Sequence, residues 1–223
     1  YYQMKFLLLS ASAALAEAFN NHIPILAKLP AWQRGNPEGE LDIQVFYDPL
    51  CPGSRDASRS WDAIADKESP VAGKTYAELA NFRVSLSVLP YHLHAYQMTQ
   101  LYYYFFQQKA EGLDLLQDYL EFCWDNIGKY DESMSEKDFK PIWSIEVANQ
   151  LGLLAGDLRA VYADENSDLF TRKVWKVPMS NGIATTPGGT VNDIVLDQVP
   201  MTEEDWEDLF KSLYPESNEE NLH

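Results

Sequence analysis

The feature that most constrains the fold of this sequence is a strand-like segment that passes directly into a helix-like one. Residues 41–47 alternate with a period of two and are rich in β-forming side chains, which predicts a strand. From Ser54 to residue 64, apolar side chains recur at helical spacing, which predicts a helix. Residues 82–89 alternate again and predict a second strand. The order strand, helix, strand indicates a βαβ unit with parallel strands.

The rest of the chain predicts a helical block, a hairpin and a final helix. Residues from about 95 to 176 carry apolar side chains at helical spacing in several segments. Residues 185–196 form two β-rich stretches around Asn192-Asp193, which indicates a hairpin. Thr202 then begins a helix whose acidic first turn suits the helix dipole. The predicted fold class is therefore α/β, with one domain over residues 41–214 that a helical insertion interrupts.

The composition is acidic, with 34 acidic and 17 basic residues and a formal net charge of −17. Nucleic-acid phosphates and anionic membrane surfaces attract basic proteins, so we expect neither as a partner. Hydrophobic residues make up 46% of the chain, enough for a sizeable core. The composition does not define an oligomeric state.

The first eighteen residues have the order of a secretory signal peptide. Lys5 precedes a short apolar run, and residues 16–18 supply the small-x-small pattern of a cleavage site. A buried N-terminal helix is the alternative. Residues 19–40 follow as an extended lead-in, and residues 215–223 form a polar tail. We therefore expect a protein of the secretory pathway, in the endoplasmic reticulum lumen or outside the cell, without a membrane anchor after cleavage. Two-part plastid targeting is the alternative address.

The sequence holds two cysteines, Cys51 and Cys123. Cys51 lies where the first strand passes into the helix, so its thiol faces unpaired N–H groups and the positive end of the helix dipole. Both favour the thiolate, which is the reactive form. Because Ser54 stands where a Cys-x-x-Cys motif has its second thiol, we expect Cys51 to form mixed disulfides without resolving them. Cys123 falls on the apolar face of a helix, where burial is expected; a Cys51–Cys123 disulfide is the alternative.

Three segments resemble DsbA-like thioredoxin-fold proteins. Residues 46–56, with the motif Cys-Pro-Gly-Ser-Arg-Asp, resemble the active-site stretch of that family, and most of all a eukaryotic group known from plants. Residues 89–96 and 186–192 resemble two further segments of the same group, in the same order. The resemblance implies a thioredoxin core interrupted by the helical block, with Pro187 in a cis-proline loop beside Cys51. The chain departs from most DsbA enzymes in having one active-site cysteine. The lysosomal thiol reductases share a similar opening but have a cysteine-rich signature that is absent here.

Four residues are candidates for the chemistry: Cys51, Ser54, His92 and Pro187. His92 follows the second strand, and the carboxyl ends of parallel strands meet at one edge of a sheet, so His92 can approach Cys51 as a base or charge partner. A hydrogen-bonded structural histidine is the alternative. Ser54 is either a hydroxyl donor to the thiolate or an ordinary residue of the first helical turn.

Substrate binding is expected at Pro52, Tyr91 and Thr186. The backbone of Thr186 would pair with an extended peptide, as in strand addition, if the bond to Pro187 is cis.

Two further patterns have structural explanations. His92 and His94 lack a third and a fourth ligand, so no metal site is expected. The aromatic run at residues 102–106 predicts packing between helices, and a groove for peptides is the alternative.

The function expected from these residues is that of a thiol–disulfide oxidoreductase or isomerase-like protein acting through Cys51 on the thiols or disulfides of exported proteins. No bound cofactor is expected, and glutathione is a candidate external thiol. A redox-inactive binding or chaperone-like module of the same fold is the first alternative. A glutathione transferase of the kappa type, which uses a serine near this helix start, is the second.

Overall fold

The computed structural model describes residues 30–71, 73–130 and 133–214. The predicted signal peptide (1–18) and polar tail (215–223) lie outside these ranges, as do residues 19–29 of the lead-in. Among the described helices, none has the length and apolar character that crossing a membrane requires.

The centre of the fold is a five-stranded sheet with the strand order β1-β3-β2-β4-β5. The two long strands, β2 (Leu41–Tyr47) and β3 (Ala80–Leu86), pair in parallel, as the βαβ pattern predicts. The short strands pair antiparallel: β1 (Trp32–Gln33) with β3, β4 (Gly188–Val191) with β2, and β5 (Ile194–Val195) with β4. The predicted βαβ unit and the late hairpin therefore share one sheet.

Strands β1 and β3 differ from the sequence interpretation. The lead-in contributes β1, whose Trp32 pairs with Val84, instead of remaining outside the sheet. β3 begins at Ala80, two residues early, because α3 (Tyr76–Leu79) leads straight into it. β3 also ends before the predicted residue 89, although the Ser87 N–H still donates to the Tyr47 carbonyl at 2.8 Å.

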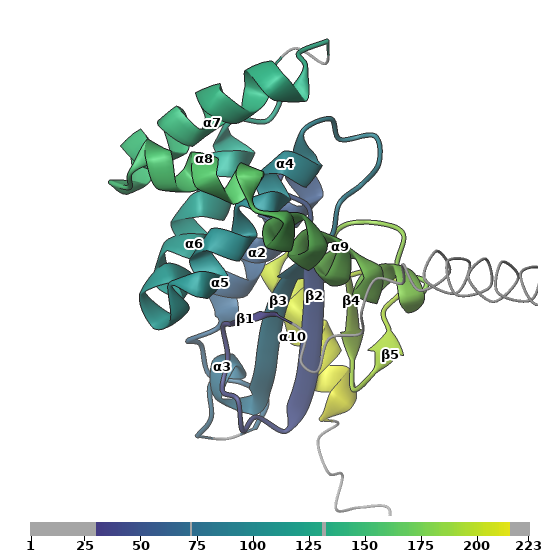
Figure 1. Cartoon of the computed structure of the whole chain (residues 1–223). Coiled ribbons are helices and arrows are strands. Elements are labelled where there is room, and N and C mark those ends of the chain that lie inside the picture. Colours follow the sequence, from purple (N-terminus) through teal and green to yellow (C-terminus); the bar gives the residue numbers. More distant parts are fainter. Residues whose placement is uncertain (1–29, 72, 131–132, 215–223) are drawn as a thin grey trace, which may run out of the picture.

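Helix α2 (Pro52–Ile64) follows β2 and packs on one face of the sheet. Its Trp61 ring stacks on Phe82 of β3, with centroids 3.9 Å apart, and meets Trp206 edge-on at 5.1 Å. Trp206 belongs to α10 (Glu203–Leu213), which lies behind the sheet in Figure 1. Aromatic pairs of this kind each contribute about 0.5–1.5 kcal/mol beyond the burial of their area. These contacts hold α2 rigidly against β3 and α10.

In the part of the chain that the structure describes, the block between β3 and β4 consists of six helices: α4 (Ala95–Gln100), α5 (Tyr102–Gln107), α6 (Lys109–Asp125), α7 (Glu136–Leu151), α8 (Ala155–Ala163) and α9 (Glu165–Ser180). Figure 1 shows α7 and α8 beyond one end of the sheet. The block is tied to β3 and the loop after it by side chains: Tyr102 donates to the Val84 carbonyl at 3.4 Å, and Trp175 donates to the Val88 carbonyl at 2.9 Å. The aromatic run at 102–106 packs against the core, with Tyr102 and Phe105 fully buried.

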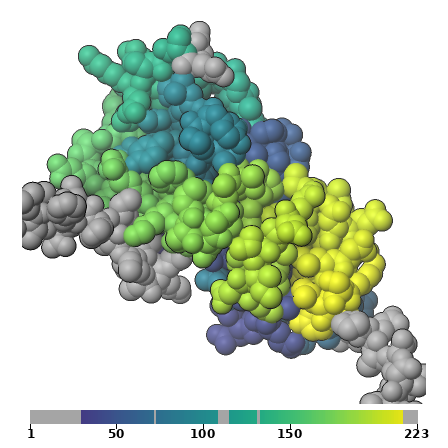
Figure 2. All heavy atoms as spheres, turned by 90° about the vertical axis from the view of Figure 1, so that its right-hand side faces the viewer, coloured from purple at the N-terminus to yellow at the C-terminus, as the bar shows by residue number. Residues whose placement is uncertain are grey.

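The β4–β5 hairpin turns through Asn192 and Asp193, whose φ angles of 49° and 66° lie in the left-handed region. A two-residue turn of this kind matches the twist of the strands that it joins, and Asn and Asp tolerate such angles. Figure 2 shows the hairpin and α10 side by side on one flank of the molecule, with α9 next to them. The loop before β4, which contains Pro187, contacts the start of α2 at Gly53.

Candidate active site

Cys51 is the residue immediately before α2, and Pro52 is the first residue of that helix. A proline is suited to this position because its ring presets φ and its missing N–H would have had no helical partner. The thiol of Cys51 therefore lies at the positive end of the helix dipole. Cys51 is only 7% exposed, and its S–H donates to the Thr186 carbonyl at 3.1 Å.

The loop before β4 lies against the first turn of α2. The Thr186–Pro187 peptide bond is cis. Gly53 makes this approach possible: a Cβ at position 53 would lie 3.1 Å from Pro187 Cδ and 3.6 Å from Cys51 Sγ. Three of the predicted site residues, Cys51, Thr186 and Pro187, are thus brought together. The Thr186 hydroxyl is buried and has no hydrogen-bond partner.

Ser54 is fully buried in the first turn of α2. Its Oγ accepts a hydrogen bond from the Asp48 N–H at 3.1 Å. The hydrogen bond found for this side chain therefore goes to the backbone of the loop that carries Cys51 and not to the thiol. Ser54 fastens that loop to the helix.

Asp48 is a buried acid that the sequence interpretation did not select. Its Oδ1 accepts from the Leu50 N–H and its Oδ2 from the Leu89 N–H, both at 2.7 Å. Its backbone carbonyl accepts from the indole N–H of Trp124 at 3.1 Å. A buried carboxylate is costly unless it is paired and hydrogen-bonded, and these contacts supply the hydrogen bonds that Asp48 needs. The available signal in the sequence was an acid placed directly after a predicted strand, three residues before Cys51.

His92 was predicted to approach Cys51, and the contact found for its ring nitrogen is with Asp48. Its Nδ1 is 3.0 Å from Asp48 Oδ1, which is within ion-pair distance but off the line of a well-formed hydrogen bond. The His92 side chain is partly exposed, and the ring of Tyr91 meets it edge-on at 4.9 Å. His92 is therefore tied to the loop of Cys51 through a carboxylate.

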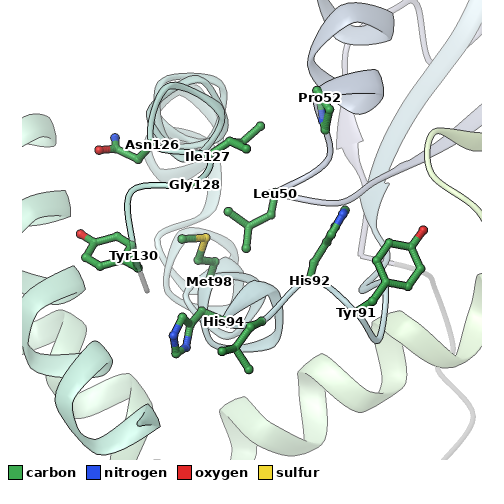
Figure 3. A pocket seen from close by; sticks show the side chains of 11 residues that line it. Leu50, Pro52, Tyr91, His92, His94, Met98, Asn126, Ile127, Gly128 and Tyr130 are labelled. Carbon is green, nitrogen blue, oxygen red and sulfur yellow. The ribbon is translucent and has the colours of Figure 1, made fainter. Parts of the chain in front are cut away.

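A pocket of about 280 Å³ opens next to this loop. Figure 3 shows Leu50, His92 and Met98 around its centre. Pro52 and Tyr91 are both exposed and both line it, so two of the predicted substrate-binding residues share one cavity. The third, Thr186, accepts the hydrogen bond of the Cys51 thiol and does not line the pocket. None of the five aromatic residues at 102–106 lines it either.

Cys123 lies on α6 and is fully buried. Burial raises the pKa of its thiol well above the ordinary range. Cys51 and Cys123 are both free, so the alternative of a disulfide between them is wrong.

Metal ligands do not assemble in the part of the chain that the structure describes: no group of three or more His, Cys, Asp or Glu side chains could hold an ion there. His94 instead stacks on Phe139, with ring centroids 4.1 Å apart and planes within 4°.

Comparisons with solved structures agree on the fold, whereas comparisons of the sequence find no match. No protein-family model matches the sequence, and no curated protein matches it. Among solved structures, DsbA2 of Pseudomonas aeruginosa matches with a TM-score of 0.59 and 14% identity, over 87% of this chain and 100% of that one. DsbA of Chlamydia trachomatis matches with a TM-score of 0.56 and 14% identity, over 87% and 96%. A thioredoxin-like oxidoreductase from Silicibacter pomeroyi matches with a TM-score of 0.52 and 19% identity, over 82% and 92%.

These likenesses identify the class of fold. The chain has the DsbA-like thioredoxin fold, an α/β core with a helical insertion, and the fold prediction is confirmed. The site built on it is a thiol at the start of a helix, with a proline loop against the first turn of that helix and a pocket next to the loop that carries the thiol.

Proposed function

We propose that this protein is a thiol–disulfide oxidoreductase or isomerase-like protein that reacts through Cys51 with the thiols or disulfides of exported proteins. The observation that carries the proposal is the position of the Cys51 thiol. It lies at the N-terminus of α2 and beside Pro187, in the fold of known thiol–disulfide oxidoreductases. The names of the structural neighbours, DsbA2, DsbA and a thioredoxin-like oxidoreductase, support the reaction class.

The reaction begins with attack of the Cys51 thiolate on one sulfur of a substrate disulfide. A new S–S bond forms between Cys51 and that sulfur, and the other substrate sulfur leaves as a thiolate. Ser54 has no thiol to attack the adduct. Release therefore depends on a second thiol of the substrate, which gives isomerisation, or on an external thiol such as glutathione, which gives reduction.

Two groups serve proton transfer and substrate alignment in this proposal. His92 is the proposed base or charge partner for the thiolate, and its Nδ1 is 3.0 Å from Asp48 Oδ1. An extended substrate pairs with the backbone of Thr186. Within the described residues, the Thr186 N–H has no backbone acceptor of its own, which supports this pairing.

The proposed location is the secretory pathway, where disulfides persist. The predicted signal peptide at residues 1–18 supports export. The relationship to the eukaryotic group with the Cys-Pro-x-Ser-Arg-Asp motif is part of the same proposal and rests on residues 51–56.

Trapping with oxidised glutathione tests the function. The mature protein is incubated with oxidised glutathione and with a disulfide-bonded model protein, quenched with acid and mapped by mass spectrometry. Wild type and Cys123→Ala should each carry one mixed disulfide at Cys51, and Cys51→Ala should carry none because Cys123 is buried.

Two results would overturn the proposal. If wild type forms no adduct with either reagent, the binding or chaperone-like alternative replaces it. If Cys51→Ala conjugates glutathione to an electrophile as fast as wild type and Ser54→Ala does not, the kappa-type transferase replaces it.

A further inference from the structure

The pocket beside Cys51 differs in charge from the rest of the protein. The chain has 34 acidic and 17 basic residues, yet the pocket lining includes no Asp, Glu, Lys or Arg. The lining consists of two histidines, an asparagine, a glycine and seven apolar or aromatic residues: Leu50, Pro52, Tyr91, His92, Leu93, His94, Met98, Asn126, Ile127, Gly128 and Tyr130. One of the histidines, His92, already faces the Asp48 carboxylate. An uncharged ligand group is therefore what this lining can bind.

Large apolar side chains are exposed around the same pocket. Tyr91 is 70% exposed, Leu93 46% and Ile127 37%. They come from two connections, one between β3 and α4 and one between α6 and α7, that lie far apart in the sequence. Apolar side chains that gather at the surface in this way mark an interaction site, because each costs free energy while it faces water.

The pocket lies next to the loop that carries Cys51. Leu50 and Pro52, the two chain neighbours of Cys51, both line it, whereas Cys51 itself does not. Residues near the cysteine of a substrate joined to Cys51 through sulfur are therefore within reach of this pocket. The volume of about 280 Å³ is at the small end of ligand pockets, which run from about 300 to 1,000 Å³. It suits one or two side chains better than a large cofactor.

We propose that this pocket is a specificity subsite for an apolar side chain, aliphatic or aromatic, close to the reacting cysteine of an extended substrate polypeptide. The inference rests on the proposed thiol chemistry of Cys51 and names the substrates that it prefers. A carboxylate on the substrate is disfavoured twice: the lining has no cation to pair with it, and the chain as a whole is strongly acidic.

The test compares peptides that differ at one side chain. Short extended peptides carry a single cysteine, protected as a mixed disulfide with glutathione, and Phe, Leu, Ser or Asp at each position within two residues of it. The rate of adduct formation at Cys51 is measured by acid quench and mass spectrometry. At the best position, Phe and Leu should react roughly tenfold faster than Ser, as expected for burying one apolar side chain. Asp should react more slowly than Ser.

Matched variants connect the preference to the pocket. Leu93→Asp introduces a carboxylate at a half-exposed lining position and should reduce the ratio of the Phe rate to the Ser rate to below about twofold. Leu154→Asp makes the same change at a side chain that is 71% exposed and outside the pocket, and it should leave the ratio as in wild type.

Three outcomes would overturn the inference, and they separate it from the proposed function. If adducts form at equal rates with Phe and Ser at every position, the subsite is refuted while the thiol chemistry stands. The same holds if Leu93→Asp keeps the full preference. If neither oxidised glutathione nor any peptide reacts with wild type, the proposed function and the subsite fail together.

Discussion

The buried Asp48 allows a quantitative test of how the site is held together. Its carboxylate accepts hydrogen bonds from two backbone N–H groups, those of Leu50 and Leu89, both at 2.7 Å. Asp48→Asn keeps the size of the side chain but replaces one acceptor oxygen with an NH₂ group. One backbone N–H then faces another donor, and the other N–H keeps only a neutral acceptor.

The expected loss follows from these two changes. A hydrogen bond to a charged group contributes about 1.5–3 kcal/mol, and a buried donor left without a partner costs about 1–3 kcal/mol. We expect Asp48→Asn to lower the free energy of unfolding by about 3 kcal/mol. Since domains have about 5–15 kcal/mol of stability, the variant should still fold.

Urea unfolding followed by tryptophan fluorescence measures this loss. The matched control is Asp42→Asn, because Asp42 pairs with Arg83 at 2.6 Å but its side chain is 40% exposed. The control should lose less than about 1 kcal/mol, as exposed ion pairs do. If the free energy of unfolding of Asp48→Asn is within 1 kcal/mol of the wild-type value, or is larger, the two hydrogen bonds to the carboxylate do not stabilise the loop.

Two further predictions concern the thiols. Ser54→Cys places a second thiol one turn from Cys51. This thiol can attack a glutathione adduct at Cys51, so the variant should release glutathione without added thiol and form an internal disulfide. Adducts as long-lived as those of wild type would contradict this prediction. Burial raises the pKa of the Cys123 thiol, so the folded protein keeps a proton that the unfolded chain loses above a pKa of about 8.5. The stability that the protonated Cys123 thiol contributes is therefore complete below a pH of about 8.5 and is lost as the pH rises above it. Between pH 8 and 10 the free energy of unfolding should therefore fall more steeply for wild type than for Cys123→Ala, by up to about 1.4 kcal/mol per pH unit. Urea unfolding at several pH values measures both slopes, and equal slopes would show that Cys123 contributes nothing.

The parts of the fold that the sequence predicted are those with local patterns. Alternation at residues 41–47 and helical spacing after Ser54 are each produced by side chains that face one core, so they can be read without knowing the partner element. Asn192-Asp193 marked its hairpin because few residues tolerate left-handed φ angles. The approach of Pro187 to Cys51 came from the resemblance to DsbA-like proteins and not from any local pattern.

The parts that were missed depend on contacts between distant residues. β1 has two residues, too few for any periodicity, and exists because Trp32 and Gln33 find partners on β3. Asp48 resembles an ordinary loop acid until the Leu89 N–H, 41 positions later, is placed against it. The apolar pocket draws on three separate connections, none of which is distinctive alone.

The hydrogen bond between Cys51 and Thr186 joins two residues that are far apart in the sequence, and this has a consequence for synthesis of the protein. The carbonyl that accepts the S–H of Cys51 belongs to Thr186, which is synthesised 135 residues later. If the protein is exported as proposed, a chain that emerges N-terminus first presents Cys51 to an oxidising compartment before Thr186 is synthesised. Cys123 also emerges before Thr186, so both thiols are accessible in the same unfolded chain. Because both cysteines are free and buried in the native fold, a disulfide between them would have to form before folding is complete.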